Sequence, residues 1–127
     1  MEINNSQVLA EVGAAFQRYQ DAILSNDVPV LKELFWNDAL TLRYGTAENL
    51  YGHDEISGYR VARSATNLAR EETRRVVTCY GRDYATTNIE YTRDGRHGRQ
   101  SQAWVRMPEG WRIVAAHVSY MDEVQPA

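Results

Sequence analysis

The feature that most constrains the fold is a change of pattern near residue 69. Before it, apolar residues recur at three- and four-residue steps, and the clearest stripe predicts an amphipathic helix over residues 6–25. After it come four segments rich in Val, Ile, Thr, Tyr and Trp, separated by short glycine- or proline-containing runs: 70–80, 83–92, 99–107 and 111–120. Such runs are typical of hairpin turns. We therefore expect an α+β protein with helices on one face of a curved, antiparallel sheet.

The first half of the chain holds further short elements. Residues 28–36 predict a second helix, and a third is expected from residue 53 to about 64 or 67. Residues 40–44 predict a short strand, and residues 46–52 a loop. No linker or internal repeat is visible, so residues 1–127 are expected to form a single domain.

Composition excludes several classes of protein. The net charge of −3 argues against general binding of nucleic acids. No segment is apolar for long enough to cross a membrane, and the first residues lack the pattern of a signal peptide, so a cytoplasmic location is expected. The lone cysteine, Cys79, excludes an internal disulfide framework, and the histidines His53, His97 and His117 are too far apart in sequence to suggest a metal site.

Charge is distributed unevenly along the chain. Residues 1–58 contain nine acidic and three basic residues, whereas residues 59–112 contain six acidic and eleven basic ones. All basic residues except Lys32 are arginines, which suit fixed, bidentate recognition of carboxylates. The simpler interpretation is that most of them form a solvated surface.

No strong catalytic motif is present, but Tyr19 and Arg43 form a candidate pair. Tyr19 falls in the apolar stripe of the first helix, so its hydroxyl is expected to point inward. Arg43 lies between apolar neighbours in a strand, where a guanidinium needs a carboxylate or a water-filled cavity. If the two meet, the cation would favour tyrosinate and would bind an anionic substrate. Alternatively, Arg43 pairs with Glu48, Asp54 or Glu90, and Tyr19 belongs to the core.

The last two predicted strands carry polar side chains on faces that alternation would turn inward. In the final strand, one face runs from bulky to small and polar: Trp111, Ile113, Ala115, His117 and Ser119. In the strand before it, one face carries Gln100, Gln102, Trp104 and Arg106. Glutamines on a central strand are costly to bury unpaired, so this face lines a wet pocket or forms a dimer surface. For His117, a hydrogen-bonded histidine in the core is the alternative.

Aromatic residues in the predicted sheet also suggest an oligomer. An exposed face carrying Tyr80, Tyr91, Trp104 and Tyr120 would be an unusually large adhesive patch. We therefore expect this face to be covered by a second copy in a twofold dimer.

The order of the motifs resembles a known family. The matching stretches are 26–28, 34–36, 43–45, 48–52, 98–102, 104–105 and 110–119, the last reading GWRIVAAHVS. This set resembles the SnoaL-like (nuclear-transport-factor-2-like, cystatin-like) superfamily and, more narrowly, the AtzH-like group that includes the oxalurate-catabolism protein HpxZ. Ala103 departs from the group, where threonine is favoured.

The resemblance implies a conical fold, with a pocket between the helices and a strongly bent, mostly antiparallel sheet, and dimers formed through that sheet. One fold of this kind serves isomerases, dehydratases, cyclases and non-catalytic domains, so the fold alone does not give function. The narrow group is linked to the breakdown of oxalurate and of carboxylated ureas and biurets from cyanuric acid. In one branch, which converts a dicarboxylated urea to allophanate, the proposed active pair matches Tyr19 and Arg43.

The leading hypothesis is thus a decarboxylating amidohydrolase that uses no metal and no organic cofactor. Arg43 would bind a carboxylate of a small, anionic, urea-like substrate, and Tyr19 would act as general acid and base. Further substrate contacts are expected from Arg63, Gln102, Trp104, His117 and Ser119. The alternative is a non-catalytic protein that binds an unstable ureido acid or assists an amidase acting on oxalurate or carboxybiuret.

Overall fold

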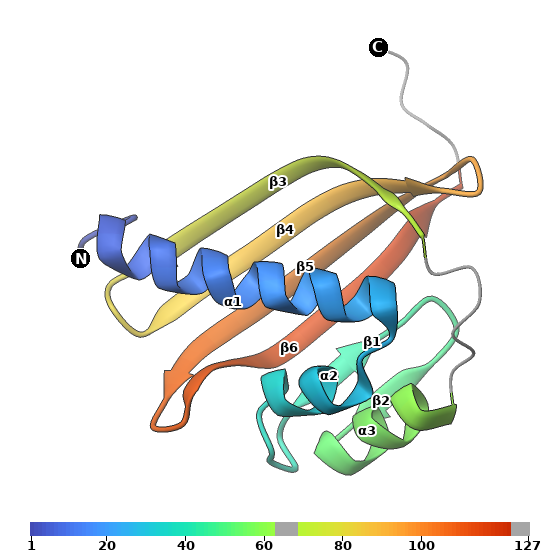
Figure 1. The fold of residues 1–127 in the computed structure, drawn as a ribbon, viewed down its shortest axis with the longest axis horizontal. Helices are drawn as coiled ribbons and strands as arrows, with labels where there is room; N and C mark the ends of the chain where they lie inside the picture. Colours follow the sequence, from blue (N-terminus) through green and yellow to red (C-terminus); the bar gives the residue numbers. More distant parts are fainter. Residues whose placement is uncertain (63–68, 123–127) are drawn as a thin grey trace.

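The computed structural model describes residues 1–62 and 69–122, and its helices lie against one face of a bent sheet (Figure 1). The helices are α1 (Ser6–Ser25), α2 (Val28–Leu34) and α3 (His53–Ala62). The strands are β1 (Leu42–Tyr44), β2 (Asn49–Tyr51), β3 (Glu71–Tyr80), β4 (Tyr84–Arg93), β5 (Arg96–Met107) and β6 (Gly110–Met121). The predicted α+β class and the order of helices before the meander are confirmed. The third predicted helix was expected to end within residues 63–68, which lie outside the described part of the chain.

The sheet has the strand order β2-β1-β6-β5-β4-β3. All neighbours are antiparallel except β1 and β6, which run parallel. The segment 46–52, expected to be a loop, contains β2, whose three residues pair with β1. A strand this short shows no readable alternation of apolar and polar residues, so its pairing with β1, rather than its own sequence, defines it.

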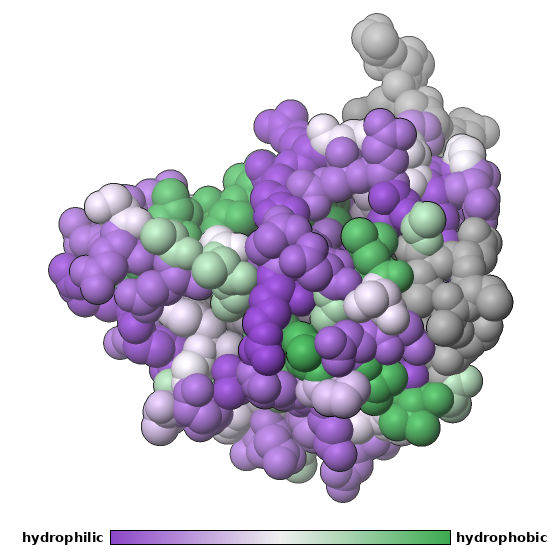
Figure 2. Space-filling model, in the orientation of Figure 1, coloured by the Kyte–Doolittle hydropathy of each residue, from purple (hydrophilic) through white to green (hydrophobic). Residues whose placement is uncertain are grey.

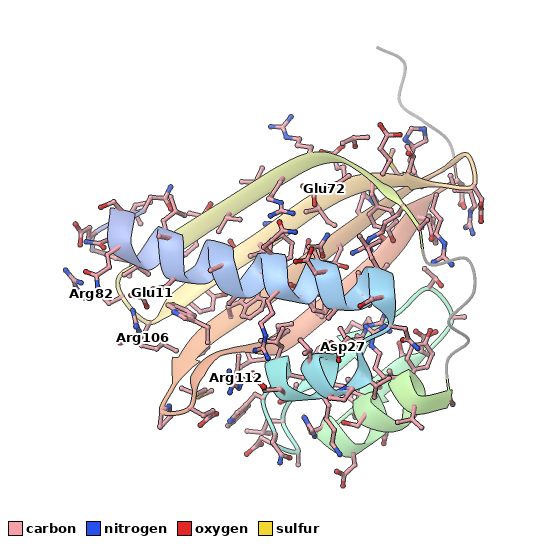
Figure 3. All side chains as sticks on the ribbon, viewed as in Figure 1. Glu11, Asp27, Glu72, Arg82, Arg106 and Arg112 are labelled. Carbon is pink, nitrogen blue, oxygen red and sulfur yellow. The ribbon has the colours of Figure 1, made fainter. Side chains whose placement is uncertain are left out.

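Helix α1 lies across the inner face of the long strands and buries Val8, Val12, Phe16 and Tyr19 against them. The Phe16 and Trp104 rings meet edge to face, with 6.5 Å between centroids. Near the start of the helix, Glu11 accepts a 2.7 Å hydrogen bond from Nη1 of Arg106 on β5, and the two side chains approach each other in Figure 3. These contacts fix the N-terminal half of α1 on the sheet and leave its C-terminal half beside α2 and α3 (Figure 1).

A β-bulge in β6 changes which of its side chains face the helices. Ala103 of β5 pairs with Ala115, whereas the next residue, Trp104, pairs with Ile113, so Val114 is the extra residue. Trp111 and Ile113 are buried on the inner face before the bulge. After it the inner positions are Ala116, Val118 and Tyr120, so the uniform alternation expected for this strand was wrong.

Gly98 allows the ring of its pairing partner Tyr91 to lie directly over the backbone of β5. A Cβ at residue 98 would be 2.3 Å from Cζ of Tyr91, closer than a side chain can be placed without displacing the ring. Replacing Gly98 by alanine should therefore lower the free energy of unfolding by about 1–3 kcal/mol, the usual cost of overpacking. Urea denaturation measures this difference.

The matched control is Gly13→Ala in α1, where a Cβ would meet nothing within 4 Å. Alanine has the higher helix propensity, so this variant should gain about 0.5–1 kcal/mol. Equal stability of the Gly98→Ala and Gly13→Ala proteins would contradict the close packing of Tyr91 on β5.

Candidate active site

A hollow lies between the C-terminal half of α1, α3 and the inner face of the sheet. Its volume is about 60 Å³, and four arginines are among its described lining residues, so we call it the arginine cavity: Arg43, Arg60, Arg70 and Arg93. Four tyrosines also line it: Tyr19, Tyr59, Tyr91 and Tyr120. The arginine cavity thus combines cations with hydroxyl groups in one small hollow.

Tyr19 points inward from α1, as the periodicity of the helix predicted, and its side chain is buried. Its ring meets Phe35 edge to face, with 6.1 Å between centroids. Its hydroxyl oxygen accepts a 3.1 Å hydrogen bond from Nη2 of Arg60. A guanidinium can only donate, so in this contact the phenol oxygen is the acceptor whatever its protonation state. Among residues 1–62 and 69–122, the cation that donates to the Tyr19 hydroxyl is therefore Arg60 rather than Arg43.

Arg60 is a residue that the sequence reasoning missed. It is 1% exposed and belongs to the buried face of α3, together with His53, Ile56 and Ser57. These residues are spaced at positions i, i+3, i+4 and i+7 of one helix, which places Arg60 on the same side as an apolar residue. That spacing was the signal that would have identified it.

Arg43 lines the same cavity from β1, the strand between β2 and β6. It is 5% exposed, and its Nη1 donates a 2.8 Å hydrogen bond to Oε1 of Glu48. The guanidinium carbon also lies 5.3 Å from the centre of the Tyr59 ring, and that of Arg60 lies 5.8 Å from the same ring. Tyr59 thus contacts both cations. Tyr19 and Arg43 share one cavity, while Glu48 supplies the carboxylate considered as the alternative partner of Arg43.

The opposite wall is an amide and guanidinium cluster of Arg70, Gln20 and Gln100; Gln100 lies on the face of β5 for which a wet pocket was one of the two interpretations, whereas Arg70 and Gln20 were not predicted as part of a site. Nη2 of Arg70 donates to the side-chain oxygens of Gln20 at 3.0 Å and of Gln100 at 3.3 Å. The Gln100 amide donates in turn to Gln20 at 3.2 Å, so both glutamines are paired. Arg70 also stacks 4.5 Å from the centre of the Tyr91 ring. Arg70 lies just before β3, where the sequence has no periodic pattern from which its inward position could be predicted.

Two predicted substrate contacts lie instead in the core of the sheet. Gln102 and Trp104 face inward, as the alternation of β5 predicted, but neither lines the arginine cavity. Trp104 donates from its indole nitrogen to Thr87 at 2.9 Å, and Thr87 donates to the Gln102 side-chain oxygen at 3.1 Å. This chain of hydrogen bonds satisfies the indole and occupies the Gln102 oxygen within the core.

His117 and Ser119 lie on the outer face of the sheet, away from the arginine cavity. The bulge at Val114 reverses the alternation, so residues 115, 117 and 119 face outward while Val118 and Tyr120 line the cavity. His117 is exposed, and its ring meets Tyr44 edge to face at 5.7 Å. The expectation that these residues share a face with Trp111 was therefore wrong. Arg63, the remaining predicted contact, lies outside the described residues.

The electrostatic character of the arginine cavity favours anions. Among its described lining residues, four arginines face one acidic side chain, that of Glu48. Guanidinium groups retain their charge at any physiological pH and match carboxylates in geometry. Within residues 1–62 and 69–122, no group of three or more His, Cys, Asp and Glu side chains is placed to hold a metal ion. The arrangement is suited to binding a small carboxylate beside a phenol that can exchange a proton.

None of the helices in the described part of the chain is long and apolar enough to span a bilayer.

The chain matches a protein family and several solved structures. The family model described as AtzH-like matches residues 1–124. A structure of a protein with unknown function from Pectobacterium atrosepticum, of the family DUF3225, is 55% identical; the match covers 94% of this chain and 95% of that chain, with a TM-score of 0.92. A cystatin-like fold protein from Burkholderia xenovorans is 41% identical, with a TM-score of 0.92 and coverage of 98% and 99%.

A nuclear transport factor 2-like protein from Salmonella enterica shares the fold, at 24% identity and a TM-score of 0.76 over 94% of this chain and 95% of that chain. The comparison with curated protein sequences gives no match. The expected superfamily and the narrower family are thus both confirmed.

The Tyr91 phenol provides a pH-dependent test of the cavity wall. Burial raises its pKa, the neighbouring Tyr120 phenol adds to this, and the Arg70 guanidinium opposes it. A folded-state pKa above the unfolded value of about 10 means that folding favours the neutral phenol. This stability is complete below about pH 10 and is lost as the pH rises through the folded-state pKa.

Urea denaturation at pH 9 and at about pH 11 should show a larger loss of stability in the wild type than in Tyr91→Phe. The other tyrosines contribute to both proteins, so the comparison isolates Tyr91. The same loss in both proteins would contradict the burial of this hydroxyl.

Proposed function

We propose, on the premise that the chain belongs to the AtzH-like family, that the arginine cavity is the active site of a hydrolase acting on a small carboxylated urea. Membership of this family fits the context of ureide and cyanuric acid breakdown. The observation that carries the proposal is the meeting of Tyr19, Arg60 and Arg43 in one cavity lined by arginines. The favoured reaction is the decarboxylation of 1,3-dicarboxyurea to allophanate, with no metal or organic cofactor.

The cations of the cavity support the binding of such a substrate. A dicarboxylated urea is a planar dianion, and arginine forms paired hydrogen bonds with planar carboxylates. Arg43 would hold one carboxylate, and Arg70 on the opposite wall would hold the other. Arg63, expected as a further substrate contact, lies outside the described residues, so Arg70 is the described arginine proposed for this second carboxylate. The buried position of Arg43, 5% exposed, strengthens each such contact because little water competes.

The chemical step needs one proton at nitrogen. The bond between the ureido nitrogen and the leaving carboxyl carbon breaks, its electron pair passes to nitrogen, and carbon dioxide departs. Tyr19 would deliver the proton that completes the new N–H bond, leaving a tyrosinate that takes a proton back from water. Arg60 donates to the phenol oxygen and so stabilises this tyrosinate. Arg60 is a positioning residue in this scheme, since its contact is with Tyr19.

The decisive experiment measures carbon dioxide and ammonia release from carboxylated ureas and from oxalurate by the purified protein. Tyr19→Phe removes the proton donor and should lower turnover by about 10²–10⁴-fold, as expected for loss of a general acid. Arg43→Ala should raise the substrate concentration needed for half-maximal rate. Tyr84→Phe, a tyrosine 41% exposed on the outer face, is the matched control and should retain full activity.

Turnover that survives both Tyr19→Phe and Arg43→Ala would contradict the assignment of this site. Tight binding of a ureide without any turnover would instead support the accessory protein, which holds an unstable ureido acid for a partner amidase.

A homodimer is part of the proposal, although through different residues from those expected. Tyr91 and Trp104 are buried, and Tyr120 lines the arginine cavity, so Tyr80, which is 37% exposed, is the one member of the expected aromatic patch at the surface. The outer face of the sheet carries a mostly apolar groove instead, lined by Leu42, Tyr44, Ala103, Ala115 and His117 among others. The opposite face, which carries α1, is largely hydrophilic (Figure 2).

Light scattering on the purified protein should therefore give the mass of two chains. Ala115→Arg places a charge in the middle of the groove and should shift the protein to one chain at micromolar concentration. The control is Glu90→Gln, at an exposed position of β4 outside the groove. A wild-type monomer at that concentration would refute the dimer.

A further inference from the structure

The turn between β1 and β2 carries Glu48, whose carboxylate contacts the buried guanidinium of Arg43 on β1. The backbone N–H of Gly45 donates to the carbonyl of Glu48 at 2.9 Å and closes this turn. The Glu48 side chain then turns back, so that Oε1 accepts from Nη1 of Arg43 at 2.8 Å. Its other oxygen, Oε2, accepts from the N–H of Ala47 at 3.3 Å.

Gly45 makes this contact sterically possible. A Cβ at residue 45 would lie 1.7 Å from Oε1 of Glu48 and 2.9 Å from Nη1 of Arg43. The glycine is therefore required where the carboxylate and the guanidinium meet, because any side chain there would occupy the position of the Glu48 oxygen.

The two partners of the ion pair are buried to different degrees. The Arg43 side chain is 6% exposed and that of Glu48 is 23% exposed. The hydrogen bond joins one oxygen to one nitrogen, and the buried Nε of Arg43 has no hydrogen-bond partner among the described residues. Arg43 is thus fixed in the cavity wall. Glu48 already contacts water, and it accepts from only one of the hydrogen-bond donors of the guanidinium.

We infer that Glu48 occupies the carboxylate subsite of Arg43 in the empty protein and is displaced when a ligand carboxylate binds. This inference rests on the proposed function, because it takes the arginine cavity as the binding site. Exchange of one carboxylate for another keeps the buried Arg43 neutralised, so no unpaired cation is left behind. Glu48 moves toward the solvent that it already contacts, where a charged carboxylate is well hydrated.

The internal carboxylate sets the affinity of the subsite. The apparent affinity of a ligand is reduced by the fraction of molecules in which the subsite is free. A monocarboxylate that replaces Glu48 exchanges one ionic contact of Arg43 for another, so its net gain in binding free energy is small. A dicarboxylate gains a second ionic contact with another arginine of the cavity, such as Arg70. Glu48 therefore lowers the affinity of every carboxylate for this subsite, so that a ligand with a second ionic contact, such as a small dicarboxylate, is needed for tight binding.

Calorimetric titration with malonate, a small dicarboxylate that the protein does not need to turn over, tests the inference. Glu48→Gln keeps the size of the side chain and removes its charge, so it should bind malonate about tenfold more tightly or better. Glu48→Ala should also bind malonate more tightly, which would show that the effect does not come from the amide that glutamine introduces. Glu90→Gln removes the same formal charge from an exposed carboxylate outside the cavity and should change the affinity by less than about twofold.

Tighter binding by both Glu48 variants and not by Glu90→Gln supports the inference. Equal or weaker binding of malonate by Glu48→Gln overturns the inference, because Glu48 would then not compete with the ligand. An absence of malonate binding in every protein overturns it as well. The result is separate from the proposed reaction: a protein that converts no ureide can still show the Glu48 effect, and turnover in the absence of that effect would leave the reaction intact.

Discussion

Burial of arginine guanidinium groups between the helices and the sheet is the constraint on which the rest of this structure depends. A cation removed from water is costly unless charged or polar groups surround it. Arg43 meets Glu48 and Tyr59, and Arg60 meets Tyr19 and Tyr59. Each of these partners comes from a different part of the chain, so forming the cavity requires α1, β1, the following turn and α3 to be in place together.

The arrangement favours an anionic ligand without fixing which one. Two of the arginines lie on regular elements, Arg60 on α3 and Arg43 on β1, whereas the single described acidic side chain of the lining lies on a turn. A ligand that carries negative charge on two sides would replace contacts the empty protein makes within itself. Such preorganisation lowers the cost of binding, because the cations need not move to receive the ligand.

Local patterns in the sequence were sufficient to predict the helices and the meander. The 3.6-residue period of residues 6–25 placed Tyr19 inward, and the alternation of β5 placed Gln102 and Trp104 inward. The turn at Asp94 and Gly95, both with positive φ, follows the residue preferences of tight hairpins. These features depend on residues that are close together in the sequence, so they could be predicted from it.

The residues that were missed depend on contacts between distant segments. Arg60 and Arg70 have structural partners 41 and 50 residues away, Tyr19 and Gln20, and no local rule reveals such pairings. The bulge at Val114 arises from the pairing of two strands, so a reading of β6 alone gave the wrong face for His117 and Ser119. In the expected Tyr19–Arg43 pair both residues were assigned to the right cavity, but the direct neighbour of the phenol was not identified.

That bulge has a consequence for how the protein can diverge. Deleting the one extra residue would restore strict alternation and leave every other side chain of β6 on the face it now occupies, because Ile113 would be followed directly by Ala115. Val118 and Tyr120 would still line the cavity, and the imidazole and the hydroxyl of the outer side would stay outside it, with no codon beyond the deleted one altered. A lineage with this architecture can thus straighten the strand without changing the cavity, whereas a β6 that kept the extra residue within a regular ladder would shift its register and turn the imidazole and the hydroxyl inward.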